Sequence, residues 1–599
     1  MRQFISAWAL VLVLSHFQLA RAVAKYSDDV CCERAQAASQ FVGDIPETII
    51  CGQAYNASID PAPNLYVSYK FCASECSGFG LSEGRKPDQW AAPIVQFLLP
   101  SVIFSMSIPR RLIFCSTDFL QDTVPRPNNV VARKIVSLLL ILISLMFVVI
   151  DTIIWVILIM GTAGIMMVAG LHEALLDYKI LKALARGRTG PQQLRATVEL
   201  LVTVVSGNLR LNGNGGRSPK PNEAITDALM ADANVRVETD DDGRNFIPFD
   251  RSESSGPLME ASQQLPNMIS ERLKRLMSAQ SAFGAIVGAP VVFYLGAFVY
   301  TILELMNKPS NQDAAISLAF GVEWMIIVHV AIVSGCLLAS NNPSPAAMLA
   351  RPPLFQGPQP WWRRIFPPVH DGEFQPVFMW RRGINKQEWL RESEVWSNTG
   401  FREDARIKWW EHGVYVVFPT LILISLPPAA GAFVALKTPP EGWGCRSLSF
   451  VVYAAFQVIL VPIYYVAQVK RPATPTGRMS WLVHSTIGWF FMAVFYLVVG
   501  LSIFTSVGTT LMQIIGVYRN CFCYVNANMW LTLDEATVNV ASDTELQRQS
   551  SRNWIIMGGV ATGFMGLCSF WGWQIQMSMR RRYGDIIRRY IQSRSQIQG

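Results

Sequence analysis

The feature of this sequence that most constrains its fold is a series of long apolar runs that carry almost no charge. Hydrophobic residues make up 51% and charged residues 16% of the 599 positions, whereas ordinary soluble domains contain about 25% charged residues. A bilayer span needs about 20 mostly apolar residues to cross roughly 30 Å of hydrocarbon. The runs therefore predict an all-α protein, a polytopic transmembrane helix bundle.

The apolar runs predict about nine spans in four blocks. Three spans fall in 91–171, two in 282–339, three in 412–506 and one in 554–574. Residues 135–171 as one helix would extend about 55 Å, more than one bilayer requires. We therefore expect two spans in this stretch, with a turn at Asp151-Thr152 or, as the alternative, at Gly161–Gly164.

The N-terminus has the three parts of a secretory signal peptide. Arg2 is basic, Ala7–Leu14 is a short apolar run, and Ala22-Val23-Ala24 is a small-x-small cleavage site. We expect residues 1–24 to be removed. Residues 25–90 then form a small cysteine-rich extracytoplasmic domain.

Basic residues flank the apolar runs and predict the orientation of the chain. The loops 172–281 and 340–411 and the tail 575–599 are rich in Lys and Arg, whereas the loop 507–553 has few. Because basic loops stay in the cytosol, we expect an extracytoplasmic N-terminus and a cytosolic C-terminus, in the plasma membrane or an endomembrane of the secretory pathway. Residues 212–266 of the first loop have the composition of a disordered segment.

The cysteines fall mainly on the side that this topology places outside the cytosol. An oxidising compartment favours disulfides, and the N-terminal domain alone holds an odd number. We expect it to take a partner from a later loop, while the pairing itself stays open. The sequon at Asn56 also lies outside. The disulfide candidates are Cys31, Cys32, Cys51, Cys72, Cys76, Cys445, Cys521 and Cys523.

Ionisable residues within predicted spans are candidate functional residues, because a bilayer tolerates them only at a cost. Glu323, His329 and His484 are of this kind. Glu323 and His329 are six residues apart and so occupy different helix faces. The Pro427-Pro428 pair predicts a helix break at membrane depth, where transporters often bind substrate. Internal hydrogen bonding of the polar residues, and ordinary helix packing at the prolines, are the alternatives.

The sequence contains no convincing enzyme motif. His172 and Asp177 have the spacing of a membrane acyltransferase pair, but no second motif accompanies them. A phosphate-binding loop, a nucleophile elbow and a dinucleotide fingerprint are missing. We therefore expect no enzyme activity, no cofactor and no metal. The basic residues that give the net charge of +8 lie beside the spans and form no basic stripe on a soluble domain. We therefore expect no nucleic-acid binding.

Three short segments resemble uncharacterised multi-spanning membrane proteins of filamentous fungi. These segments are Asp29-Val30-Cys31-Cys32-Glu33-Arg34, Trp90–Phe97 and Ile108-Pro109-Arg110-Arg111. The resemblance implies a similar general plan over most of the chain. It implies no activity and no functional residue.

The polar residues in the spans and the kinked helices lead us to expect a transporter or channel-like protein. The alternatives are a cell-surface receptor or sensor, whose disulfide-bonded ectodomain meets a ligand, and a membrane scaffold. Membrane lipid is an expected partner. A cytosolic adaptor could bind the loops 172–281 and 340–411.

Overall fold

The structure is a computed structural model of the whole chain, and it describes the greater part of it. The described residues are 28–43, 51, 60–76, 79–80, 89–108, 130–186, 194–211, 270–278 without 272 and 276, 283–338, 374–393, 396, 399–439, 441–465, 486–541 and 543–598. The predicted signal peptide, Asn56, His484 and residues 212–266 lie outside them.

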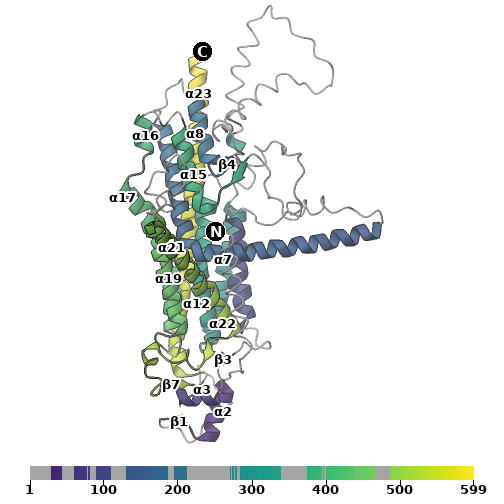
Figure 1. The fold of residues 1–599 in the computed structure, drawn as a ribbon, viewed down its shortest axis with the longest axis vertical. Helices are drawn as coiled ribbons and strands as arrows, with labels where there is room; N and C mark the ends of the chain where they lie inside the picture. The colour runs from purple at the N-terminus through teal and green to yellow at the C-terminus, as the bar shows by residue number, and fades with distance from the viewer. Residues whose placement is uncertain are drawn as a thin grey trace, which may run out of the picture.

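The described residues form an elongated bundle of helices with a small domain at one end (Figure 1). We call the end that carries the four disulfide bonds the disulfide end, and the opposite end, where the C-terminal helix finishes, the tail end. Helices account for most elements, as predicted. Seven helices of the described chain are long and apolar enough to cross a membrane, which indicates a membrane protein. Their number differs from the predicted nine spans.

The elements are grouped by position. At the disulfide end lie α2 (Asp28–Ala38), β1 (Phe41–Val42), β2 (Tyr66–Ser68), α3 (Tyr69–Glu75), β3 (Phe79–Gly80), β6 (Arg519–Asn520), η10 (Ala527–Met529) and β7 (Thr537–Asn539). The bundle contains α4 (Ala91–Pro93), η3 (Ile94–Leu98), α5 (Leu99–Ser107), η4 (Gly284–Gly288), α11 (Ala289–Asn307), α12 (Gln312–Ile332), η5 (Val333–Leu337), η7 (Gly413–Val417), α18 (Phe418–Leu436), α19 (Cys445–Tyr464), α21 (Thr486–Ile503), η9 (Phe504–Gly508), α22 (Thr509–Ile515) and α23 (Glu545–Gln598). Toward the tail end lie α7 (Val130–Ala185), α8 (Leu194–Ser206), β4 (Leu209–Leu211), β5 (Phe374–Pro376), α15 (Met379–Glu392), α16 (Thr399–Ala405) and α17 (Trp409–His412).

The helix α12 is the centre of the bundle. Every residue from Ala314 to Leu337 is buried, because α5, α7, α11, α18 and α23 all pack against this helix. A helix that is apolar on all sides must be surrounded by other apolar surfaces. The outer helices expose large apolar side chains, such as Phe293 on α11 and Trp571 on α23, as expected where lipid replaces water.

Three of the bundle helices begin with a π-helical turn that precedes a proline by two residues. The turns η3, η4 and η7 precede Pro100, Pro290 and Pro419, respectively. Proline has no N–H to donate and its ring crowds the carbonyl four residues earlier. A wider π turn changes the hydrogen-bond partners at that point and lets the helix continue through the proline.

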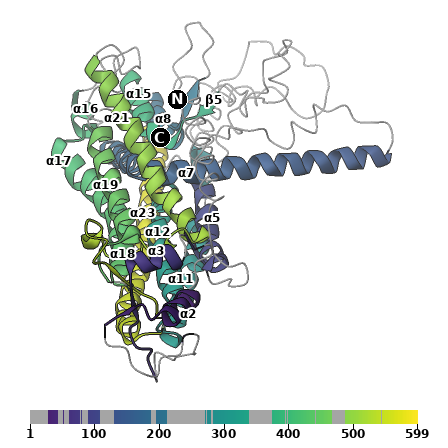
Figure 2. The same cartoon turned by 60° about the horizontal axis from the view of Figure 1, so that its bottom comes forward.

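The helix continues through the predicted turn at Asp151-Thr152, whereas the alternative position, Gly161–Gly164, coincides with a kink. Residues 130–185 form one helix, α7, that passes through Asp151 and bends at Thr162, where φ is −123° and ψ is 20°. The bend falls within the alternative position, Gly161–Gly164, but the chain changes direction there without turning back. The N-terminal part of α7 extends sideways across the long axis of the bundle (Figures 1 and 2).

The bend in α7 is held open by one side chain of α19. In a straight helix, the N–H of Gly164 would donate to the carbonyl of Met160. Here Gly164 N donates to Gln457 Oε1 at 2.8 Å, and Gln457 Nε2 donates to Met160 O at 2.9 Å. The inserted amide thus replaces both halves of the missing backbone bond, one of the known causes of a kink. Gln457 is fully buried and also donates to Ser502 Oγ at 2.7 Å.

The disulfide end is built jointly from the N-terminal domain and the segment before α23. The antiparallel sheet β1-β2-β7 pairs Tyr66 with Asn539, and β3 pairs with β6. The disulfides are Cys31–Cys76, Cys32–Cys51, Cys72–Cys521 and Cys445–Cys523. The N-terminal domain therefore does take one partner, Cys521, from a later loop. The sulfur atoms of Cys31, Cys72 and Cys76 lie close enough together to suggest a metal site, but all three take part in disulfides.

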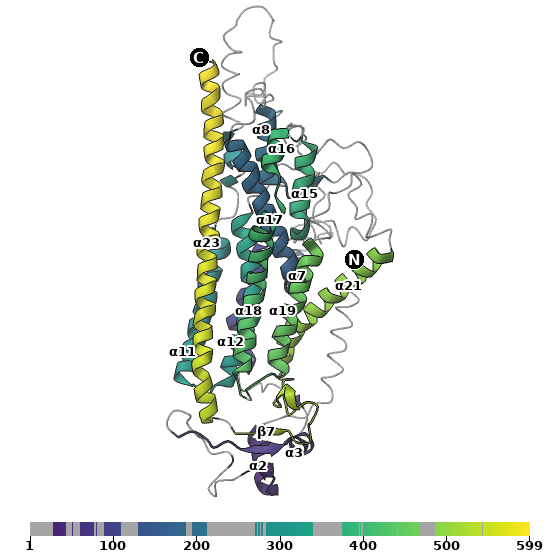
Figure 3. The same cartoon turned by 90° about the vertical axis from the view of Figure 1, so that its left-hand side faces the viewer.

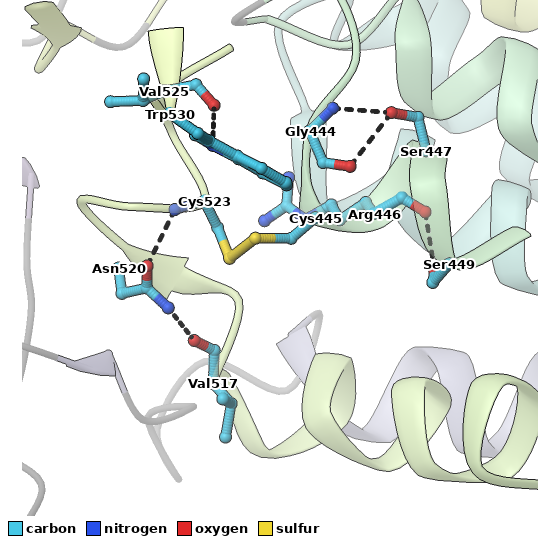
Figure 4. The surroundings of a disulfide bond; sticks show 10 residues. All are labelled: Gly444, Cys445, Arg446, Ser447, Ser449, Val517, Asn520, Cys523, Val525 and Trp530. Atoms are coloured by element: carbon cyan, nitrogen blue, oxygen red, sulfur yellow. Dashed lines mark hydrogen bonds between the residues drawn. A yellow bond between two sulfur atoms is a disulfide. The ribbon is translucent and has the colours of Figure 1, made fainter. Parts of the chain in front are cut away.

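The Cys445–Cys523 bond ties the start of α19 to the same segment (Figure 4). Cys523 N donates to Asn520 Oδ1 at 2.8 Å, and Asn520 Nδ2 donates to Val517 O at 2.8 Å, which fixes the turn that presents Cys523. On the other side, Gly444 N donates to Ser447 Oγ at 2.9 Å at the first turn of α19.

A second apolar core lies at the tail end, within segments that the sequence predicts as loops. Side chains of α7, α8, α15, α16 and α23 pack together there, Trp389 and Tyr583 among them. We call this group the tail-end layer: α7 from His172 onward, α8, β4, β5, α15, α16 and α23 from Met579 onward. The strands β4 and β5 pair Leu209 with Pro376, which joins the two predicted loops.

Replacing Gln457 with Leu should destabilise the protein and straighten α7. Leucine has a similar volume but leaves the buried Gly164 N–H without a partner, at about 1–3 kcal/mol. The Met160 carbonyl loses one of its two donors and keeps the Tyr453 hydroxyl at 2.9 Å. Thermal unfolding in nanodiscs would measure the loss, with the exposed Gln549→Leu as the matched control. Spin labels at Leu145 and Ala185 would report the bend, since a straight helix separates these positions by about 60 Å. An unchanged label distance and melting temperature would contradict this role of Gln457.

Candidate functional site

Four fully buried charged side chains join α7 to α15 in the tail-end layer. Glu173 and Asp177 lie one turn apart on α7, and Arg382 and Lys386 lie one turn apart on α15, so each pair shares one helix face. Lys386 Nζ lies 2.9 Å from Glu173 Oε1 and 2.7 Å from Asp177 Oδ1. Arg382 Nε lies 3.3 Å from Glu173 Oε2. We call these four residues the ion cluster.

The helices can approach so closely because glycines stand at the contact points. A Cβ on Gly383 would lie 2.8 Å from His172 Cδ2, and one on Gly207 would lie 2.8 Å from Lys386 Cε. Asn385 adds two hydrogen bonds, donating to Gly207 O at 2.8 Å and to Leu209 O at 2.9 Å. The segment after α8 is thereby fixed against α15.

Two histidines extend the ion cluster toward α17. The rings of His172 and His412 stack with centroids 5.0 Å apart, and the Gln387 amide nitrogen lies 2.7 Å from His172 Nε2. Lys179 Nζ contacts Glu411 Oε1 at 2.6 Å. These contacts hold α17 against the outer face of α7.

The ion cluster carries two positive and two negative charges, and all four side chains have no solvent exposure. Buried charges are tolerated when each is paired, whereas removing one partner is costly. Asp177 binds Lys386 and not His172, so the acid–base pair expected of an acyltransferase spacing is not formed. The geometry fits a rigid joint between α7 and α15.

Glu323 is a buried acidic residue on the central helix α12. It lies 11 residues after the start of α12, a depth of about 16 Å and hence near mid-bilayer. Its side chain is fully buried, and neither carboxyl oxygen has a hydrogen-bond partner among the described residues. A small hollow nearby is lined by Phe97, Phe320 and Trp324 and does not include Glu323.

The structure brings together two of the sequence-predicted features, His329 and the Pro427-Pro428 pair. Pro427 lies inside α18 and cannot donate to the carbonyl of Leu423 four residues earlier. His329 Nδ1 donates to this carbonyl at 3.1 Å. The histidine thus satisfies a backbone group that the proline leaves free. Both prolines are buried in packed helix, and the hollow described above does not reach them.

The remaining predicted residues have separate positions. Glu323 and His329 do not form one site, and His484 and Asn56 lie outside the described residues. Sequence reasoning did not single out Arg382, Lys386 or Gln457. The available signal was the matched spacing of four residues in Glu173/Asp177 and Arg382/Lys386, but both pairs fall in stretches predicted to be solvated loops.

Comparison of the chain with known protein families, curated proteins and solved structures found no match.

Removing the cation at the centre of the ion cluster should destabilise the tail-end layer strongly. Lys386→Met leaves Glu173 and Asp177 buried with a single partner, and we expect a loss of about 3–5 kcal/mol. Lys437→Met, which breaks a half-exposed pair with Glu441, should cost less than about 1 kcal/mol. Hydrogen exchange of α15 would measure the difference. Equal protection of α15 in the two variants would contradict the joint.

A double-mutant cycle tests the contact between His329 and the carbonyl of Leu423. His329→Leu should cost about 1–3 kcal/mol because the carbonyl loses its donor. In the Pro427→Ala background the same change should cost much less, since residue 427 regains an N–H that can donate to Leu423 O. Steric trapping in lipid bicelles measures both free energies. Additive effects of the two substitutions would show that the residues act independently.

Proposed function

We propose that this chain is a receptor-type sensor, in which the state of the disulfide-bonded ectodomain is passed to the tail-end layer. The observation that supports it is the course of α23 (Figure 3). This helix starts at Glu545, six residues after β7 of the ectodomain sheet, and continues without a break to Gln598. Its length of about 80 Å exceeds the thickness of a bilayer.

The outer end of α23 is fixed to the ectodomain. Ala62 and Thr544 form a β-bridge just before the helix begins, and Val540 N donates to Leu65 O at 2.9 Å. The Cys72–Cys521 bond joins the same domain to the loop that leads into β7. A displacement of the ectodomain sheet must therefore move the start of α23.

The other end of α23 is packed into the tail-end layer. Tyr583 is buried there, and its hydroxyl lies 3.4 Å from Leu201 O of α8. Gln576 Nε2 donates to Gly335 O at 3.1 Å, which also ties α23 to η5, the turn that follows α12. Because the ion cluster makes α7 and α15 one unit, a movement of α23 acts on the layer as a whole.

The proposed setting is a membrane of the secretory pathway, with the disulfide end outside the cytosol. Disulfides form in oxidising compartments, and the basic residues Arg580–Arg582 of α23 lie at the other end, as the positive-inside rule requires. The tail-end layer then faces the cytosol, where its helices would meet a signalling partner or adaptor.

Transport is a second candidate, favoured by Glu323. A buried carboxyl group without a partner near mid-bilayer is typical of proton or cation pathways. Proton flux into pyranine-loaded proteoliposomes tests this function. Flux that Glu323→Gln abolishes would establish it, and flux that equals protein-free liposomes would exclude proton transport.

The sensor proposal is tested with a nanobody against the ectodomain and the full-length protein in nanodiscs. Binding should change hydrogen exchange in α8, α15 and α16 at least twofold. Ser578→Pro, an exposed site between the apolar part of α23 and Tyr583, should abolish the change because proline kinks the helix. Ser593→Pro, six residues after the buried Ile587, is the matched control. No change in the unmodified protein, or an equal change in Ser578→Pro, would overturn the proposal.

A further inference from the structure

Two cations lie on the ring of one exposed tyrosine in the tail-end layer. Arg582 of α23 has its guanidinium carbon 4.9 Å from the centroid of Tyr178, and Lys182 Nζ lies 5.7 Å from the same centroid. Tyr178 is 37% exposed, and both cationic residues are exposed. We call these three residues the basic cluster.

The acidic side chains that form ion pairs around the basic cluster are already used by other cations. Glu411 pairs with Lys179 at 2.6 Å, Asp404 pairs with Arg186 at 2.9 Å, and Asp585 pairs with Arg588 at 2.9 Å. Within the described chain, Lys182 and Arg582 form no ion pair of their own. Two positive charges on adjacent helices are thus left for an external anion.

The basic cluster lies at the level expected for lipid headgroups. Lys179, next to Tyr178, binds Glu411 of α17, and the adjacent Trp409 and Trp410 are 84% and 44% exposed. Exposed tryptophans favour the membrane interface. On α23, Arg582 lies eight residues after the predicted apolar span 554–574.

We infer that the basic cluster binds an anionic phospholipid whose headgroup carries a phosphate monoester. A phosphate monoester has a charge of about −1.5 to −2 at neutral pH, which matches the two free cations. The guanidinium of Arg582 can bind two phosphate oxygens at once, and Lys182 supplies a point charge beside it. The Tyr178 hydroxyl is a further donor at the edge of the same ring. A bound lipid would join α7 to α23, and this inference does not depend on the sensor proposal.

Native mass spectrometry of the full-length protein tests the site, with dioleoyl phosphatidic acid and dioleoyl phosphatidylcholine as probes. The unmodified protein should retain the phosphatidic acid at least tenfold more than the phosphatidylcholine. The double variant Lys182→Gln/Arg582→Gln should reduce this ratio to within twofold of one. The matched control Lys437→Gln/Arg548→Gln has the same net charge and removes two cations at the disulfide end, one half-exposed and one exposed. It should keep the full ratio.

Further measurements separate the lipid site from its alternatives. Melting temperatures of the double variant and the unmodified protein should agree, because the replaced side chains are exposed. Lys182→Arg/Arg582→Lys, which keeps both charges, should retain most of the preference. Equal retention of phosphatidic acid by the Gln double variant would overturn the proposal. Displacement of the lipid by equimolar glycerol 3-phosphate would also overturn it, since the site would then bind soluble phosphates.

Discussion

The architecture depends on one inserted side chain, the amide of Gln457 in α7. An apolar helix of 56 residues would, if straight, be more than twice as long as a bilayer is thick. By bonding Met160 O and Gly164 N, Gln457 lets the same helix lie across the bundle and then enter the tail-end layer. Glu173 and Asp177 reach α15 only because the helix bends before them. The bend therefore determines whether the ion cluster can form.

The same physical requirement recurs at several points of the molecule. Backbone groups in an apolar environment must find a partner, and α18 meets this need through His329, whereas α7 meets it through Gln457. Both solutions use a polar side chain from a neighbouring helix, so each fixes the relative position of two helices as well. Intramembrane polar residues need not mark a substrate path. Glu323 differs from them because no described residue accounts for its carboxyl group.

The sequence predicts the helical class and the disulfide between the N-terminal domain and a later loop well, and the arrangement of the spans only partly. Apolar runs report length and polarity, which locate helices such as α12 and α18 within a few residues. They do not report the direction in which a helix runs. The path of residues 135–171 depends on Gln457, which is 293 residues away from Gly164 and cannot be connected with it from the apolar pattern. The ion cluster cannot be predicted from the sequence for a related reason. The sequence around Arg382 and Lys386 predicts solvated charges, because the carboxylates that allow their burial come from α7, far away in the sequence. The odd cysteine count, by contrast, is independent of geometry and predicts a long-range bond.

The Cys72–Cys521 bond has a consequence for biosynthesis. Its two cysteines are 449 residues apart, so a chain made from the N-terminus presents Cys72 long before its partner exists. Every bundle helix except α23 is encoded between them. Oxidation of this pair can therefore follow only after nearly the whole bundle has been synthesised. The presence of this disulfide thus distinguishes a completed chain from a partial one. A chain arrested earlier would keep a reactive thiol, the kind of signal that quality-control machinery can recognise.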